Sequence, residues 1–232
     1  MSRAHENWLF VGVIFIAILL TGRPTAIMAN ERFDLIADAA GFTIAVLGLL
    51  MRVVSRDWKL VHGQDTLVTT GPYSMVRNPM YVGSFLAGFG ICLVLGSTIF
   101  AIIFTVCFFA VHISIARREK RYLITCWPDE YSQYMADVPE WIPSCKRIFD
   151  FLFRSGRHLS TIPGAFIRER SSICGVLIGA CLAEVAADTI LRGWARTHAE
   201  AIILLGVVFA LSLTWIVAGK LYNLPGFAKY RV

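Results

Sequence analysis

The chain has 232 residues, of which 56% are hydrophobic and only 16% are charged, whereas an ordinary soluble domain has about a quarter of its residues charged. This composition excludes a typical soluble domain, a disordered segment and a coiled coil. The formal net charge of +6 does not indicate a nucleic-acid partner, because the basic residues lie in the loops between apolar runs, where they normally set membrane orientation. The composition predicts a polytopic helical membrane protein.

Six apolar runs are candidates for membrane-spanning helices, each of which needs about 20 residues. The first run ends early, at Arg23 and Pro24. Its alternative interpretation is a cleaved signal peptide, but Ile27 is a poor residue before a cut at Ala29. We therefore expect an all-α fold with about six transmembrane helices, and the runs are residues 8–22, 35–54, 80–95, 97–116, 172–191 and 201–219.

The third and fourth runs are separated only by Gly96 and Ser97, so these two helices must turn back at once as a tight helical hairpin. Six spans place both termini and the loops 52–77 and 117–170 on one side of the membrane. All but four of the 22 basic residues lie on that side, and the positive-inside rule therefore predicts that it is cytosolic. The hairpin brings the residues before and after it to this same face, where we expect the site.

Residues 65–83, just before the hairpin, read DTLVTTGPYSMVRNPMYVG. Gly71 and Pro72 indicate a turn, and Asn78 followed by Pro79 indicates a helix start with asparagine as its N-cap. Main-chain donors and aromatic side chains at a helix start favour a site for a polar ligand. The structural alternative is a juxtamembrane turn anchored by its tyrosines.

This stretch resembles the signature of the isoprenylcysteine carboxyl methyltransferase and phospholipid N-methyltransferase family, whose members are membrane enzymes that use S-adenosylmethionine. The family pattern is T-L-V-T-x-G-x-Y followed by R-H-P-x-Y-x-G. A second family block has a glutamate, an aromatic residue, a short acidic turn, Y-x-x-Y and V-P. Residues 119–143 match it with EKRYLITCWPDEYSQYMADVPEWIP. Two blocks in the right order around a hairpin are more specific than either alone, and the resemblance covers about residues 35–143.

The resemblance implies a cofactor pocket for S-adenosylmethionine. Glu119 would accept charge-assisted hydrogen bonds from the amino group of the cofactor's methionine portion; its structural alternative is a surface ion pair with Arg118 or Lys120. The segment 65–68 would approach the cofactor largely through its main chain. The positions that match the family's cofactor-binding residues are Asp65, Thr66, Leu67, Val68, Tyr73, Asn78, Pro79, Met80, Tyr81 and Glu119.

Three positions depart from the family pattern. Asn78 stands where the family usually has a histidine, and an amide cannot titrate near neutral pH. Lys120 replaces a second acid that often follows the first. Ile115 stands where prenylcysteine-specific members carry an arginine suited to binding the acceptor carboxylate. These departures weaken the prenylcysteine assignment more than the general assignment as a methyltransferase.

Methyl transfer from a sulfonium is an in-line displacement, so the enzyme must align the reacting atoms and exclude water. A carboxylate or thiolate acceptor needs no general base, whereas an ammonium acceptor must first lose a proton. His62 and His112 are candidates for that base, each with a structural alternative. We expect three arginines to orient an anionic acceptor or a lipid phosphate, with membrane anchoring as their alternative role: Arg77, Arg117 and Arg118.

Glu184 and Asp188 share one helix face in the C-terminal region, where intramembrane acids are functional candidates and snorkelling to the surface is the alternative. The basic, aromatic segment 146–170 is typical of an interfacial amphipathic helix. The chain is thus expected to have four parts: an N-terminal membrane segment (1–34), a methyltransferase core (35–145), a basic amphipathic cytosolic connector (146–171) and a two-helix membrane extension (172–232).

The sequence therefore predicts an integral membrane methyltransferase that uses S-adenosylmethionine and acts on a lipophilic acceptor, such as a lipid or a prenylated molecule, in contact with membrane lipids. One alternative is a phospholipid N-methyltransferase. Another is a degenerate, non-catalytic membrane binding or transport module in which Glu184 and Asp188 carry the function. No metal site is expected, because the six cysteines form no C-x-x-C pair and no zinc-finger spacing. No nucleic-acid partner is expected either, because the basic residues lie in the loops between apolar runs.

Overall fold

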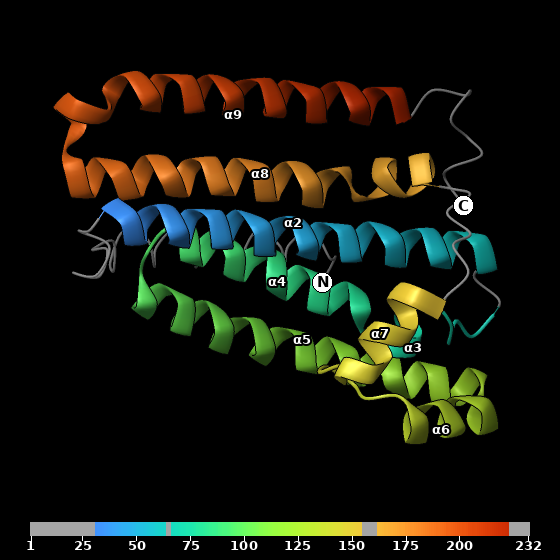
Figure 1. Cartoon of the computed structure of the whole chain (residues 1–232). Helices are drawn as coiled ribbons and strands as arrows, with labels where there is room; N and C mark the ends of the chain where they lie inside the picture. Colours follow the sequence, from blue (N-terminus) through green and yellow to red (C-terminus); the bar gives the residue numbers. More distant parts are fainter. Residues whose placement is uncertain (1–30, 64–65, 155–161, 223–232) are drawn as a thin grey trace.

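The computed structural model describes residues 31–63, 66–154 and 162–222. The first apolar run and Asp65 lie outside these residues. The described chain is built from α-helices (Figure 1), which confirms the predicted all-α class. Four of its helices are long and apolar enough to cross a membrane, and a fifth is apolar but shorter. The protein is therefore an integral membrane protein, and five of the six predicted runs are helical.

The helices extend beyond the apolar runs that predicted them. In particular, α5 continues past residue 116 and carries Glu119 on the same helix as the fourth run. The described part of the predicted connector is not one helix, because it forms α7 and the first turns of α8. The helices are α2 (Glu31–His62), α3 (Pro72–Met75), α4 (Pro79–Val94), α5 (Thr98–Cys126), α6 (Pro128–Asp137), α7 (Cys145–Arg154), α8 (Ile162–Arg192) and α9 (Trp194–Tyr222).

Helices α2 and α4 pack backbone against backbone. A Cβ atom at Gly48 would lie 2.5 Å from the main chain of Gly83 and of Ala87, and one at Gly90 would lie 2.4 Å from the carbonyl oxygen of Gly41. Small residues are what allow transmembrane helices to approach this closely. The contact runs along the two helices, with residues 41–48 of α2 against residues 83–90 of α4.

The predicted tight hairpin joins α4 and α5. Gly96 has a φ of +67°, a left-handed conformation that favours glycine. Ser97 is the N-cap of α5, and its hydroxyl accepts a hydrogen bond of 3.3 Å from the backbone N–H of Phe100. The hairpin therefore brings the start of α4 and the end of α5 to the same end of the bundle, as predicted.

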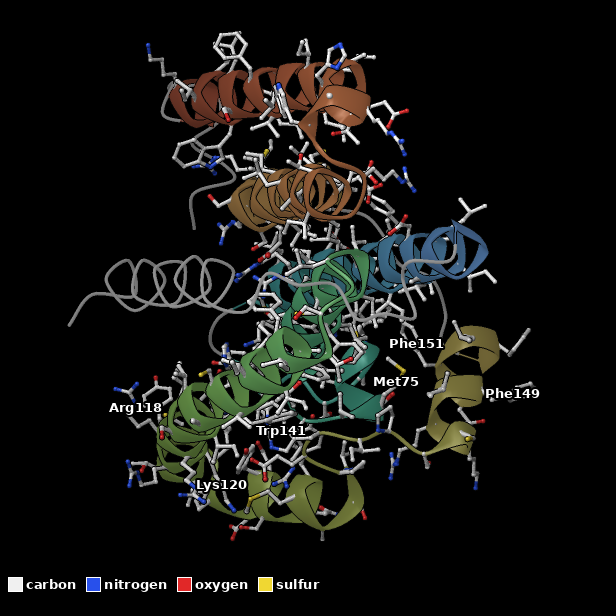
Figure 2. The ribbon with its side chains drawn as sticks, turned by 90° about the vertical axis from the view of Figure 1, so that its left-hand side faces the viewer. Met75, Arg118, Lys120, Trp141, Phe149 and Phe151 are labelled. Carbon is white, nitrogen blue, oxygen red and sulfur yellow. The ribbon has the colours of Figure 1, made fainter. Side chains whose placement is uncertain are left out.

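The remaining helices lie on either side of the α2–α4 pair (Figure 1). Helix α8 packs on α2 and α4, and α9 packs on the outer side of α8. Helix α7 stands at the edge of the bundle, where Figure 2, a view along the long helices, shows Phe149 pointing away and Phe151 turned toward Met75 of α3. The exposed side chains of α7 include Phe149, Leu152 and Phe153, so one apolar face of this short helix is open.

Candidate active site

The two motif blocks meet through a direct side-chain contact. Tyr81 lies in the first turn of α4 and Glu119 lies near the end of α5. The Tyr81 hydroxyl donates a hydrogen bond of 3.0 Å to the Glu119 carboxylate. The Glu119 side chain remains 38% exposed, so its carboxylate is accessible from the end of the bundle. The structure thus brings together two residues that the sequence predicted to share a site.

Lys59 of α2 joins this pair. Its ammonium lies 3.7 Å from a Glu119 carboxylate oxygen and 5.4 Å from the centroid of the Tyr73 ring, within cation–π range. Sequence reasoning missed Lys59 because it lies outside both motif blocks. The available signal was its spacing from Arg52 and Arg56, since positions i, i+4 and i+7 share one face of a helix.

The first block folds against the last turns of α2. Gly71 has a φ of +61°, and a Cβ atom there would lie 2.2 Å from the Trp58 ring, so this turn requires glycine. The Trp58 indole donates a hydrogen bond of 3.1 Å to the Thr70 hydroxyl. Val68 and Tyr73 pack with Trp58 in one buried cluster, which fixes the segment that leads to α3.

The neighbouring residues of this block have structural contacts. The Thr66 hydroxyl donates a hydrogen bond of 2.6 Å to the His62 carbonyl, and Leu67 packs on the buried cluster of Tyr131, Tyr134 and Val138. The two blocks are therefore in contact here as well as at the tyrosine–glutamate pair. The side chains of Thr66 and Leu67 are thus engaged in contacts of this segment.

The hydroxyl of Tyr73 is a buried polar atom with no hydrogen-bond partner among the described residues. Burial, followed by the negative charge of Glu119, raises the pKa of this phenol, so it remains a neutral donor at physiological pH. The Tyr73 carbonyl accepts a hydrogen bond of 2.6 Å from the Tyr134 hydroxyl, and burial also raises the pKa of Tyr134. A buried donor without a partner is costly, and this fits a site whose ligand supplies the acceptor.

The loop after α6 closes over the start of α4. The backbone N–H of Arg77 donates a hydrogen bond of 2.9 Å to the Pro139 carbonyl, and the Arg77 guanidinium lies 3.5 Å from the Glu140 carboxylate. Helix α4 begins after Asn78 as predicted, but the Asn78 side chain makes no capping hydrogen bond. Its amide instead donates to the Glu140 carbonyl at 3.4 Å, so this side chain ties the two blocks together.

Aromatic rings surround Tyr81. Its ring centroid lies 6.3 Å from that of Trp141 and 5.4 Å from that of His112. The His112 ring stacks on Phe108 at 3.8 Å, and its Nδ1 lies 2.9 Å from the Phe108 carbonyl oxygen. Because a carbonyl only accepts hydrogen bonds, Nδ1 carries the proton in this contact. Of the two candidate bases, His112 thus lies at the site, whereas His62 stacks on Trp58 with ring centroids 6.4 Å apart.

The predicted arginines separate into two groups. Arg77 lies beside the site but pairs with Glu140. Arg117 and Arg118 are exposed, and Figure 2 shows Arg118 at the outer edge of the molecule, away from Trp141. Each step along a helix turns the side chain by about 100°, so the residues just before Glu119 face other directions. The structure does not bring Arg117 and Arg118 to the tyrosine–glutamate pair.

Two predicted pocket residues contribute through helix geometry. Pro79 is buried at the first position of α4, where its fixed φ suits a helix start. The carbonyl of Met80 accepts a hydrogen bond of 3.3 Å from Arg52 of α2. Arg52 was not among the predicted residues, and its contact braces the turn that carries Tyr81.

Asp188, one of the two acids predicted as functional candidates in the C-terminal region, has a local partner. Asp188 of α8 forms an ion pair of 3.0 Å with Arg192, one turn further along the same helix. This contact favours the structural interpretation of Asp188. Among the described residues, no group of three or more His, Cys, Asp or Glu side chains is arranged to hold a metal ion.

The arrangement of Glu119, Lys59 and Tyr73 has the polar groups that the methionine portion of S-adenosylmethionine requires. The Glu119 carboxylate is available to the ammonium group of the cofactor. The Lys59 ammonium and the buried Tyr73 hydroxyl are available to the carboxylate of the cofactor. The chain's residues therefore fit this cofactor. The site stands at the polar end of an apolar hairpin, which suits a cofactor from water and an acceptor from the membrane.

Comparisons with known proteins agree with the motif blocks. The profile of the phospholipid methyltransferase family matches residues 39–130, a range that includes both Tyr81 and Glu119. A protein-S-isoprenylcysteine O-methyltransferase from Schizosaccharomyces pombe is 35% identical over 77 residues, which are 33% of each chain. No solved structure matches the chain.

Two further relatives align over most of their length. The nickel-cobalt-cadmium resistance protein NccN of Alcaligenes xylosoxydans is 30% identical over 166 residues, covering 70% of this chain and 72% of that protein. The cobalt-zinc-cadmium resistance protein CzcN of Cupriavidus metallidurans is 30% identical over 151 residues, covering 62% of this chain and 69% of that protein. The similarity to these two proteins therefore extends over more of the chain than the family profile does.

Proposed function

The chain belongs to the family of integral membrane methyltransferases that includes the phospholipid and isoprenylcysteine enzymes, and from this premise we propose that it transfers the methyl group of S-adenosylmethionine to a lipophilic acceptor. The observation that carries this proposal is the 3.0 Å hydrogen bond between Tyr81 and Glu119. It joins the two motif blocks at an accessible carboxylate, beside an ammonium and a buried donor.

The polar side chains would divide the work of holding the cofactor. Glu119 accepts hydrogen bonds from the ammonium of the methionine portion, with Tyr81 fixing the orientation of its carboxylate. Lys59 and the Tyr73 hydroxyl bind the carboxylate of the same portion. S-adenosylmethionine, when bound, supplies an electrophilic methyl group on a sulfonium. The protein's task is then to align the acceptor with that group and to exclude water.

The acceptor is proposed to enter from the membrane between apolar helices, and the site is proposed to face the cytosol. The position of Phe109 supports this path. Its ring centroid lies 5.6 Å from that of Trp141, at the polar site, and 5.1 Å from that of Phe85, in the aromatic core of the hairpin. Partial similarity to the isoprenylcysteine enzyme supports a prenylated carboxylate as acceptor. A carboxylate requires no general base at neutral pH.

A phospholipid amine is the second candidate acceptor, and the position of His112 favours it. The imidazole packs edge-on against Tyr81, and with its proton on Nδ1 the basic nitrogen is Nε2. Such a group can remove the proton that an ammonium acceptor must lose. Assays with phosphatidylethanolamine and with a prenylated cysteine distinguish the two candidates by which product forms.

The two metal-resistance relatives support a biological setting for the reaction. NccN and CzcN are named for resistance to nickel, cobalt, zinc or cadmium. We propose that methylation of a membrane component by this chain contributes to such resistance. Expression of the wild type and of Glu119→Gln in a metal-sensitive bacterium tests this: growth in cobalt or cadmium salts should improve only with the wild type, and equal growth would reject the link.

Titration calorimetry of the detergent-solubilised protein with S-adenosylhomocysteine tests the cofactor site directly. Glu119→Gln should weaken binding by about 1 to 3 kcal/mol, because a hydrogen bond to a charged group contributes about 1.5 to 3 kcal/mol and solvent screening at this partly exposed carboxylate lowers that value. Glu130→Gln is the matched control, because Glu130 is an exposed acid in the first turn of α6. Absence of binding by a folded wild type would reject the proposed function, and equal binding by Glu119→Gln would reject the role of Glu119.

A further inference from the structure

Glu169 is a buried acid within an apolar helix. It lies in α8, in the candidate membrane span Gly164–Ile190, and is only 2% exposed. Charged side chains at such positions are costly and, by default, functional candidates. Glu169 was not among the residues singled out from the sequence, because it lies in the segment assigned to the connector.

Two arginines of α2 hold this carboxylate. The Nε and Nη2 atoms of Arg52 donate to one Glu169 oxygen at 2.9 and 2.6 Å. Arg56 donates to the other oxygen through Nε at 2.9 Å, and its Nη2 lies 2.8 Å from the same atom. Both carboxylate oxygens are therefore occupied by charge-assisted hydrogen bonds, which have the geometric specificity of guanidinium–carboxylate pairs.

Arg52 also reaches the third helix of the cluster. Its Nη1 atom donates to the Met80 carbonyl at 3.3 Å and to the Ser84 hydroxyl. The Ser84 hydroxyl in turn donates to the same carbonyl at 2.9 Å. One guanidinium thus connects Glu169 of α8 to the first turns of α4, directly beside Tyr81.

This arrangement does more than attach α8 to the bundle. Attachment alone is achieved by apolar packing at lower desolvation cost, since replacing a buried ion pair by apolar residues is often neutral or stabilising. Arg56 contributes to the α2–α8 attachment, whereas Arg52 in addition fixes the carbonyl that precedes Tyr81. The carboxylate of Glu169 holds Arg52 in the orientation that makes this second contact.

We infer that Glu169 is a positioning residue of the methyltransferase site, acting through Arg52 on the first turn of α4. Helix α8, which lies outside the residues matched by the family profile, is then part of the scaffold of the site. The inference rests on the proposed function for its effect on the cofactor. Its structural part, the brace on α4, is tested independently of any ligand.

Three variants of the full-length protein separate positioning from attachment. Glu169→Gln removes the charge that orients Arg52. Arg52→Lys keeps a cation for Glu169 but lacks the planar fork needed to bridge Glu169 and Met80 together. Arg56→Gln is the matched control, because it removes an ion pair to Glu169 and leaves the contact between Arg52 and α4 in place.

Hydrogen exchange measured by mass spectrometry gives the ligand-independent result. Without this contact, the backbone amides of residues 80–84 should exchange faster in Glu169→Gln and Arg52→Lys, while Arg56→Gln should match the wild type in this segment. A hydrogen bond that holds a helix start lowers its rate of local opening. Unchanged exchange in the first two variants, or equal acceleration in Arg56→Gln, would overturn the inference.

Calorimetry with S-adenosylhomocysteine gives the second result. Glu169→Gln and Arg52→Lys should bind about tenfold more weakly than the wild type, because displacement of Tyr81 disturbs the carboxylate that it orients. Arg56→Gln should bind as the wild type does. Wild-type affinity in Glu169→Gln would overturn the positioning role. Failure of the wild type to bind would instead reject the proposed function, and the exchange measurement would still decide whether the brace exists.

Discussion

Replacing Tyr81 by phenylalanine removes one hydroxyl and leaves the ring in place. The ring contacts with Trp141 and His112 are retained, so the change isolates the 3.0 Å hydrogen bond to Glu119. Hydrogen bonds to charged groups contribute about 1.5 to 3 kcal/mol, but Glu119 is 38% exposed and solvent screening reduces this value. We therefore expect Tyr81→Phe to weaken S-adenosylhomocysteine binding by about 1 kcal/mol, or roughly fivefold.

A double-mutant cycle tests whether this loss acts through Glu119. Binding is measured by calorimetry for the wild type, Tyr81→Phe, Glu119→Gln and the double variant. If Tyr81 orients the carboxylate, its removal should cost little once the carboxylate is gone, giving an interaction energy of about 1 kcal/mol. Two losses that simply add would refute the reasoning, because the two side chains would then contribute independently despite their contact.

Two other substitutions test the framework of the site and its cation. Gly48→Ala places a Cβ atom 2.5 Å from the α4 main chain and should lower the unfolding temperature in detergent, because overpacking costs about 1 to 3 kcal/mol. Gly206→Ala in α9 is the control, because a Cβ atom there meets nothing within 4 Å. Equal stability of the two variants would contradict the close packing of α2 and α4. Lys59→Met should weaken S-adenosylhomocysteine binding by only about threefold, because the Lys59 side chain is 41% exposed and its charge is screened by solvent and salt. Calorimetry at low and high salt measures this effect. An affinity equal to that of the wild type at low salt would show that Lys59 does not contribute to the site.

The long helices, the hairpin and the proximity of Tyr81 to Glu119 could be predicted from the sequence. The lengths of the apolar runs predicted the long helices. The connection of only Gly96 and Ser97 between two such runs predicted the hairpin, because two spanning helices without a longer polar loop between them must turn back at once. The hairpin geometry in turn predicted that Tyr81 and Glu119 lie at one end of the bundle. Their contact therefore follows from information carried by one continuous stretch of chain.

The parts that escaped prediction depend on how helices cross. Lys59 reaches Glu119 because glycines bring α2 and α4 into backbone contact, and neither the crossing nor its register can be read from one helix. The predicted apolar run began only at residue 172, after the charged residues 168–170, since charges normally mark the edge of a span, whereas α8 begins already at Ile162. Within this helix Arg52 and Arg56 of α2 neutralise the Glu169 carboxylate, and a partner on another helix cannot be read from the sequence around residue 169.

Asn78 departs from the family motif, and in the structure its side chain has a structural role instead of a titratable one. A histidine there could titrate, whereas the Asn78 amide donates to the Glu140 carbonyl and so helps to hold the second block over the start of α4. Proton transfer is unnecessary for a carboxylate acceptor, and for an amine the nearby His112 lies on the opposite motif helix, against Tyr81. The absence of a titratable group at residue 78 is therefore compatible with methyl transfer. We expect the side chains around Tyr81, including His112 and Trp141, to determine which acceptor is methylated.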